Sequence, residues 1–195
     1  ILTGTPGKEL ILDWRKGAGV ELENGEKVYG DSVVINADFA QAMSQLVPDG
    51  ALKKYTEEKL NSMKYSCSTF MMHLGVSKQY DLPHHTIVFA RNYRKNVNEI
   101  FKSGEESSDI SLYLRNASVT DPTLAPEGKS SLYVLVPTPN LDGEIDWEEA
   151  QSRYRKLTFE ALADRLGMDD LESHIEVEIV YTPKTWETEL DIFKG

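Results

Sequence analysis

The alternation of apolar and polar side chains along residues 65–76 predicts a β-strand. Every second residue from Phe70 to Val76 is large and apolar, and the other face carries bulk as well, from Tyr65 to Met71 and His73. A strand with bulk on both faces is typical of the interior of a sheet, so we expect this strand to be central. Four other segments also have strand character: residues 85–90, 110–115, 131–136 and 174–183.

The segment 174–183 shows the most regular alternation. Its apolar positions are Ile175, Val177, Ile179 and Tyr181, and glutamates stand at positions 176 and 178. We therefore expect the apolar set to face the core and the glutamates to face solvent.

Helical spacing is clearest at residues 147–166. Asp146 is placed to cap the start of this helix, and Glu149 three residues later completes the pattern of a capping box. The apolar stripe consists of Trp147, Ala150, Tyr154, Leu157 and Ala161. Further helices are predicted at residues 39–62, with an interruption at 48–50, and at 93–103 and about 184–194.

The first 38 residues follow a different pattern, which indicates a separate unit. Residues 19–30 resemble a hairpin, because Asn24-Gly25 supplies the two residues that a tight turn favours. Residues 31–38 form a near-continuous apolar run, which is typical of a strand buried on both faces. Such a strand would end in Asn36-Ala37-Asp38, and ligands gather at strand ends of this kind in open α/β sheets.

These elements together predict an α+β fold, with a mixed, antiparallel-rich sheet and helices packed on one side. An unusually long connection, residues 119–128, separates two of the strands. Connections of this length are more often functional or fixed by contacts than idle. Asp121 precedes Pro122 there and is the catalytic candidate of the loop, although a turn explains this pair without any function.

The overall charge limits the classes of partner. The 195 residues carry a formal net charge of −11, whereas surfaces that bind phosphate backbones need clustered Lys and Arg. We therefore expect no nucleic-acid partner. No apolar run approaches the ~18–20 residues of a membrane span, and no secretory signal is recognisable.

Few residues suggest chemistry by themselves. The single cysteine, Cys67, excludes an intrachain disulfide and a thiolate metal cluster, and nothing beside it in sequence would lower the pKa of its thiol. His84-His85 has only His73 and His174 as possible further imidazole ligands, so we expect no metal. The sequence contains no G-x-G-x-x-G phosphate cradle, P-loop or G-x-S-x-G elbow.

Six segments, taken in order, carry a family pattern: residues 19–38, 64–76, 82–101, 111–141, 145–150 and 173–187. The first runs into an Asn-Ala-Asp loop that many flavoprotein oxidoreductases share. The fourth is the strongest match and contains the long loop. With these segments the chain resembles the bacterial carotenoid desaturase family, the phytoene and diapophytoene desaturases. Features of both branches occur, so both substrates remain open.

The resemblance implies the substrate domain of a glutathione-reductase/amine-oxidase-like flavoprotein over residues 39–195. Residues 1–38 would form an edge of the FAD-binding domain, with Asn36, Ala37 and Asp38 at the cofactor. In the family a dinucleotide-binding motif precedes this region, and a Gly-rich segment that contacts the flavin follows it. The chain therefore resembles an internal portion, and the main FAD-binding motifs lie outside it.

The activity that the resemblance implies is FAD-dependent dehydrogenation of a long polyene hydrocarbon. Selection of a hydrocarbon rests on an apolar tunnel rather than on hydrogen bonds. We expect one face of the sheet to line this tunnel. The candidate substrate-binding residues are Phe70, Met72, Leu74, Tyr113, Arg115 and Tyr133. Ordinary packing in the core is the alternative role of Phe70, Met72, Leu74, Tyr113 and Tyr133, and it is favoured for any single one of them; ion pairing is the alternative role of Arg115.

Two other functions stay open at this point. One is a carotenoid isomerase or saturase of the same superfamily, and the other is a non-catalytic lipid-binding module that has this fold. Because the substrates of the family reside in membranes, the resemblance also implies that the whole enzyme is cytoplasmic and associates peripherally with the inner face of the cell membrane.

Overall fold

The computed structural model describes all 195 residues, which form two compact units. The first unit comprises residues 1–64 with 191–193, and the second comprises residues 65–190 with 194–195. The division follows Lys64 rather than Asp38, so the helical segments after the N-terminal sheet belong to the first compact unit. The assignment of 1–38 to a cofactor domain and of 39–195 to a substrate domain stays a prediction.

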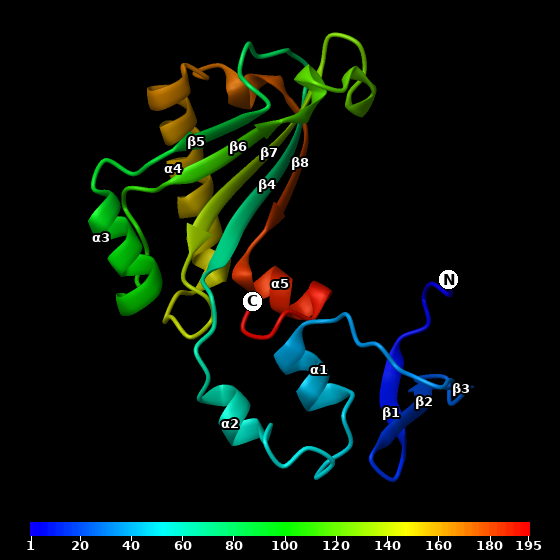
Figure 1. Cartoon of the computed structure of the whole chain (residues 1–195). Coiled ribbons are helices and arrows are strands. Elements are labelled where there is room, and N and C mark those ends of the chain that lie inside the picture. The colour runs from blue at the N-terminus through cyan, green and yellow to red at the C-terminus, as the bar shows by residue number, and fades with distance from the viewer. The chain divides into compact units, whose positions relative to one another are not determined.

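A three-stranded antiparallel sheet and two short helices make up the regular structure of the first unit (Figure 1). The elements are β1 (Gly7–Asp13), β2 (Lys16–Leu22), β3 (Lys27–Tyr29), α1 (Phe39–Gln45) and α2 (Glu57–Asn61). The predicted hairpin is confirmed, since β2 pairs with β3 across a turn in which Gly25 has a φ of +84°. Glycine reaches this left-handed conformation without the steric cost that other residues have.

The strand predicted at residues 31–38 is absent. The segment is irregular, and the side chain of Val34 is 88% exposed. The sheet of this unit ends at β3, so no strand of the chain offers hydrogen bonds to the backbone of residues 31–38. The prediction was wrong because an apolar run becomes a buried strand only where neighbouring strands pair with it.

The helix predicted after residue 50 is much shorter in the structure. Helix α2 begins after Thr56, whose Oγ1 accepts a hydrogen bond from the backbone N–H of Lys59 at 3.2 Å. Leu60 is its single buried residue. A short helix in water depends on the packing of an apolar face, so strong helix formers alone do not extend this one.

The second unit contains a five-stranded antiparallel sheet with the strand order β5-β6-β7-β4-β8 (Figure 1). The strands are β4 (Ser68–Val76), β5 (His85–Val88), β6 (Leu112–Asn116), β7 (Ser130–Thr138) and β8 (Ile175–Tyr181). Strand β4 pairs with β7 on one side and with β8 on the other. This confirms that β4 is central, as its two bulky faces predict.

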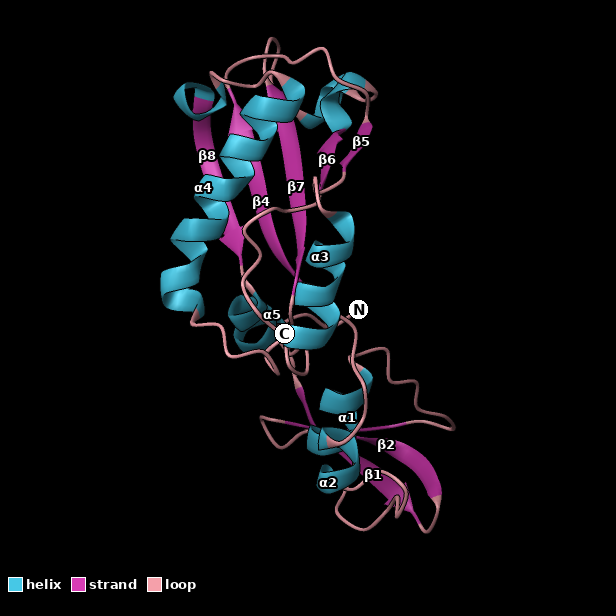
Figure 2. Ribbon diagram, turned by 90° about the vertical axis from the view of Figure 1, so that its left-hand side faces the viewer, coloured by secondary structure: helices cyan, strands magenta, loops and turns pink.

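One face of this sheet is covered by the long helix α4 (Trp147–Leu166), as Figure 2 shows. Asp146 caps the helix, because its Oδ1 accepts a hydrogen bond from the backbone N–H of Glu148 at 3.0 Å. The core between α4 and the sheet contains the fully buried side chains of Phe70, Met72, Leu74, Val134, Tyr154 and Leu162. The α+β class and the covering of one sheet face by helix are confirmed.

Two shorter helices complete the second unit. Helix α3 (Tyr93–Asn98) continues into a single π-helical turn, Glu99–Ser103, and α5 (Pro183–Leu190) follows β8. Asn96 anchors α3 from a buried position, since its Nδ2 donates to Ser107 Oγ at 2.9 Å and its Oδ1 accepts from Ser111 Oγ at 2.9 Å.

The facing predicted for the last strand was wrong for Val177 and Ile179, whereas Ile175 packs against the core as expected. In β8 the side chains of Val177 and Ile179 are 55% and 50% exposed, whereas Val180 packs against the core. Glu178 lies on the helix side, and its Oε1 accepts a hydrogen bond from Arg155 Nε of α4 at 2.7 Å. Because this guanidinium satisfies the carboxylate, the glutamate can face the helix, and its neighbours Val177 and Ile179 point to the opposite face of the sheet.

Candidate functional site

The sheet of the second unit has a second face, which we call the open face, on the side away from α4. The strand register places two rows of side chains across it. The first row consists of Ile87, Tyr113, Leu135, Met71 and Tyr181, and the second of His85, Arg115, Tyr133, His73 and Ile179. Five strands spaced at about 4.8 Å give each row a length of about 19 Å.

Aromatic contacts hold the centre of the open face in place. The ring of His73 lies edge-on between Tyr133 and Tyr181, at centroid distances of 5.1 and 5.8 Å. Tyr181 in turn stacks on Trp186 of α5 at 5.0 Å, and Trp186 Nε1 donates to the carbonyl of Thr69 at 2.8 Å. These contacts create a broad, preorganised surface of aromatic and aliphatic groups.

The centre of the open face is uncharged at neutral pH. Partial burial lowers the pKa of His73 below its ordinary value, so the imidazole is neutral at pH 7. Burial, and next the neighbouring Tyr113, raise the pKa of Tyr133, and its hydroxyl donates to Met71 Sδ at 3.5 Å. A hydrocarbon can lie on such a surface without displacing the water around a charge.

A group of polar side chains, which we call the polar corner, adjoins the open face at the ends of β5 and β6. It consists of His84, His85, Tyr113, Arg115 and Thr120. Arg115 Nε donates to His84 Nε2 at 3.2 Å, and His84 Nδ1 lies 2.7 Å from Thr120 Oγ1. His85 Nδ1 lies 2.7 Å from the hydroxyl of Tyr113, and the two imidazole rings are 4.2 Å apart. Desolvation, followed by His85 and Arg115, lowers the pKa of His84.

The predicted substrate-binding residues do not share one face, contrary to the expectation. Phe70, Met72 and Leu74 lie in the core beneath α4 and are 0–2% exposed. Tyr113, Arg115 and Tyr133 lie together on the open face. The cause is the register, which pairs Met72 with Val134 and therefore sets Tyr133 on the opposite side from the even-numbered residues of β4.

The open face also contains residues that were not among the predicted substrate-binding residues. They are Met71, His73, His85, Ile87, Leu135, Ile179 and Tyr181. Alternation had already separated Met71 and His73 from the even-numbered core positions of β4, so a signal was present in the sequence. The sequence did not show that α4 covers only the other face of the sheet.

Asp121 lies in an exposed turn of the long loop. The backbone N–H and the hydroxyl of Thr123 both donate to Asp121 Oδ1, at 3.0 and 2.6 Å. The carboxylate thereby caps the short 3-10 turn Pro122–Leu124. These two hydrogen bonds lower the pKa of Asp121. Its contacts are those of a turn residue, and its catalytic role stays a prediction.

Replacement of Asp121 by alanine tests the turn role. We expect a decrease in Tm of about 2–4 °C, the effect of one lost cap in a chain of this size. Asp121→Asn is the matched control, because its amide oxygen still accepts from Thr123 and the Tm should stay close to that of the wild type. Thermal unfolding followed by circular dichroism measures both variants, and a large loss of turnover in Asp121→Asn at unchanged Tm would contradict a role limited to the turn.

The predicted cofactor contacts lie in the first unit. Asn36 and Ala37 are exposed in the irregular segment before α1, and Asp38 caps that helix by accepting from the backbone N–H of Gln41 at 2.9 Å. An exposed amide and unpaired backbone groups fit the edge of a cofactor site. They provide no phosphate cradle of their own, so most contacts to a dinucleotide would have to come from elsewhere.

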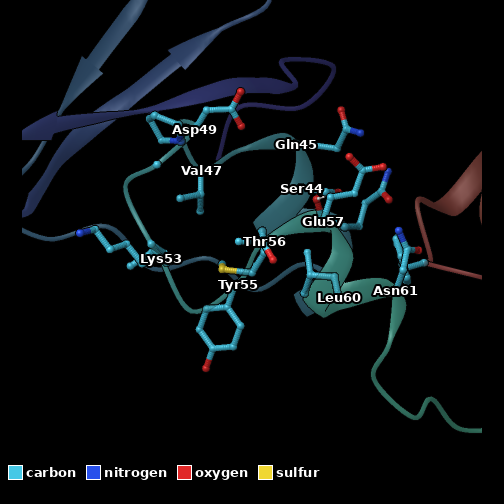
Figure 3. Close-up of a pocket in the computed structure, with 16 residues that line it drawn as sticks. Ser44, Gln45, Val47, Asp49, Lys53, Tyr55, Thr56, Glu57, Leu60 and Asn61 are labelled. Carbon is cyan, nitrogen blue, oxygen red and sulfur yellow. Dashed lines mark hydrogen bonds between the residues drawn. The ribbon is translucent and has the colours of Figure 1, made fainter.

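A groove of about 750 Å³ lies within the first unit, between α1 and the segment that leads into α2. Figure 3 shows that polar side chains dominate its labelled lining, including Ser44, Asp49, Lys53 and Glu57. None of the residues predicted from sequence as site residues lines it. The chain contains no group of three His, Cys, Asp or Glu residues that could hold a metal ion.

Comparison with known proteins gives a consistent set of relatives. No protein-family model matches the chain. The chain is 50% identical over 188 residues to a 4,4′-diapophytoene desaturase (4,4′-diapolycopene-forming) from a Methylomonas species, an alignment that covers 96% of the chain and 37% of that protein. It is 37% identical over 196 residues to an all-trans-zeta-carotene desaturase from Myxococcus xanthus, with 98% and 37% covered.

Solved structures show the same fold at low sequence identity. A protein from Pyrococcus furiosus aligns with a TM-score of 0.59 at 16% identity, over 93% of the chain and 38% of its own length. An oxidoreductase from Methanosarcina mazei aligns with a TM-score of 0.52 at 15% identity, over 91% and 37%.

The relatives of high identity agree in their named activity, and each alignment covers nearly the whole chain. The chain therefore belongs to the carotenoid desaturase family, and it spans a little over a third of the length of the relatives that it matches.

Proposed function

We propose that this chain is the substrate-domain part of an FAD-dependent desaturase that dehydrogenates diapophytoene or phytoene in carotenoid biosynthesis. The observation that carries the proposal is the 50% identity to a diapophytoene desaturase over 96% of the chain. This relative favours diapophytoene over phytoene. The open face of the second unit supports the same function, because its aromatic and aliphatic side chains extend across five strands and its centre is uncharged.

Dehydrogenation of a hydrocarbon requires positioning more than side-chain chemistry. One carbon loses a hydride, the adjacent carbon loses a proton to solvent, and a C=C double bond forms between them. FAD, when bound, supplies the acceptor for the hydride. We assign its edge contacts to Asn36, Ala37 and Asp38, and its main contacts to parts of the protein outside this chain.

The open face holds the polyene in this proposal. Burial of apolar surface contributes about 25 cal/mol per Å², so a long hydrocarbon is bound by contact area alone. The half-buried side chains of Leu135 and Tyr133 supply that area at the centre of the face, and the buried Met71 packs beneath them. The neutral imidazole of His73 packs edge-on between two tyrosine rings and adds no charge to the surface.

The proposal extends to the location of the complete protein. A hydrocarbon substrate dissolves in lipid rather than in water, so the complete protein is assigned to the cytoplasm with peripheral attachment to the inner face of the cell membrane. Within this chain, every helix falls short of the length or the apolar character that crossing a bilayer demands.

The test uses the complete protein that contains this chain, loaded with FAD. Liposomes that hold diapophytoene or phytoene are supplied with an electron acceptor, and absorption spectra are recorded over time. We expect new bands at longer wavelength, because each added double bond extends the conjugated system. A sample without acceptor is the matched control and should stop after one turnover per flavin.

Three other results would contradict the proposal. A product of changed geometry at an unchanged oxidation level would indicate an isomerase, and loss of double bonds would indicate a saturase. Binding of the polyene without any spectral change in the presence of a functional acceptor would indicate a lipid-binding module.

A further inference from the structure

Arg115 differs from the arginines of α4 in having no carboxylate partner. Arg153, Arg155 and Arg165 each form an ion pair at 2.6–2.8 Å. Arg115 Nε donates to the neutral acceptor His84 Nε2, and the structure shows no other hydrogen bond or ion pair of its guanidinium. Arg115 is exposed, and other exposed cations such as Arg94 also form no ion pair; what distinguishes Arg115 is that its Nε is held by an imidazole beside the open face.

The guanidinium of Arg115 keeps its terminal donors for another acceptor. Guanidinium carries five N–H donors in a planar fork, and Nε uses one of them. The histidine contacts fix the position of the head group, since His84 is itself held by Thr120 and stacks beside His85. The polar corner is thus a preorganised donor site that contains no negative charge.

The position of Arg115 on the open face defines the ligand that fits. Along its row the next side chains are Tyr133, His73 and Ile179, which extend over three strand spacings, or about 14 Å. A molecule that fills both regions has a long apolar chain and, at one end, an oxygen that accepts hydrogen bonds from a guanidinium. Carbonyl and carboxylate oxygens match the geometry of this fork.

We propose that the polar corner is an end-group site, at which Arg115 binds the terminal carbonyl-type oxygen of a polyene aldehyde or carboxylate whose chain lies on the open face. The inference rests on the proposed function for the location of the chain, and it adds oxygenated polyenes to the hydrocarbon substrates. A hydrocarbon end has no oxygen that could accept a hydrogen bond from Arg115, so the site discriminates between the two classes of substrate. A site that hydrogen-bonds a substrate oxygen discriminates against analogues without that oxygen more strongly than an apolar pocket discriminates between substrates of different size.

Arg115→Met tests the inference in the complete, flavin-loaded protein. The kcat/KM is measured for a hydrocarbon polyene and for the same polyene with a terminal aldehyde or carboxylate. We expect the ratio of kcat/KM for the oxygenated substrate to kcat/KM for the hydrocarbon to fall at least 10-fold, with the greater fall for the carboxylate. Arg115→Lys should recover part of the loss, because it restores the charge without the fork.

Two further measurements separate the possible failures. All-trans-retinoate binding, followed by tryptophan fluorescence, should weaken about 10-fold in Arg115→Met and stay unchanged in Arg94→Met, an exposed arginine of α3 that also forms no ion pair. Equal loss for hydrocarbon and oxygenated substrates, or unchanged retinoate affinity, would overturn the inference. Failure of the wild type to dehydrogenate any polyene, together with Arg115-dependent retinoate binding, would instead overturn the proposed function and leave the end-group site standing.

Discussion

Leu135→Asp is expected to lower the kcat/KM for the polyene by roughly 100-fold or more while the protein stays folded. Leu135 lies on the open face between Tyr113 of β6 and Met71 of β4. A carboxylate at this position would lose its hydration when a hydrocarbon covers it, and desolvation of an unpaired charge costs several kcal/mol. A loss of about 2.7 kcal/mol of transition-state stabilisation already corresponds to 100-fold. Steady-state kinetics of the flavin-loaded protein, with Tm measured in parallel, provide the test.

Val134→Asp is the matched control for this experiment. Val134 precedes Leu135 in β7, is 0% exposed and faces α4. The same carboxylate would then lie in the core, so we expect loss of the folded state itself, with a destabilisation above about 4 kcal/mol. If Leu135→Asp instead unfolds the protein as Val134→Asp does, or if it folds and retains full turnover, the assignment of the open face to the substrate is wrong.

Arg165→Ala is expected to lower the free energy of unfolding by about 3 kcal/mol, the typical result of removing one partner from a largely buried ion pair. The guanidinium of Arg165 donates to the carbonyls of Phe89 and Ile110, both at 3.0 Å, and to Asp109 Oδ1 at 2.8 Å. The side chain is 17% exposed, so water replaces these bonds poorly. Arg165 thus joins α4 to the segments that follow β5 and precede β6.

Arg153→Ala on the same helix is the control. Arg153 forms a two-point ion pair with Glu106, but its side chain is 48% exposed, and exposed ion pairs contribute little to stability. Urea denaturation should therefore show a clear decrease for Arg165→Ala and almost none for Arg153→Ala. Equal effects of the two substitutions would show that burial is not what gives the Arg165 contacts their strength.

The predictions that depended on local pattern were the most accurate. Helix α4 has the predicted bounds, and Asp146 caps it, because an apolar stripe along 20 residues and a capping side chain are local properties. The run at residues 31–38 failed for the opposite reason. Its apolar character is local, but a buried strand requires partners from other parts of a protein, and this chain supplies none.

The candidate site was only half predictable. Alternation separated Tyr113 and Arg115 from the core positions of β6, and it separated Tyr133 from those of β7. It did not reveal which faces of neighbouring strands coincide, and Phe70, Met72 and Leu74 were therefore grouped with residues of the opposite face. Pairing register joins residues that are distant in sequence, so no local pattern encodes it completely.

The sequence by itself determined the strands of the second unit, the central place of β4, the long helix and the resemblance to carotenoid desaturases. The tertiary structure decided which sheet face α4 covers, and thus that Val177 and Ile179 of β8 lie on the open face while Glu178 pairs with Arg155. It also brought Arg115 beside His84 without a carboxylate. The physical reason is that period-two alternation defines two faces of a strand, whereas the side that is buried depends on helices and strands that pack from elsewhere in the chain.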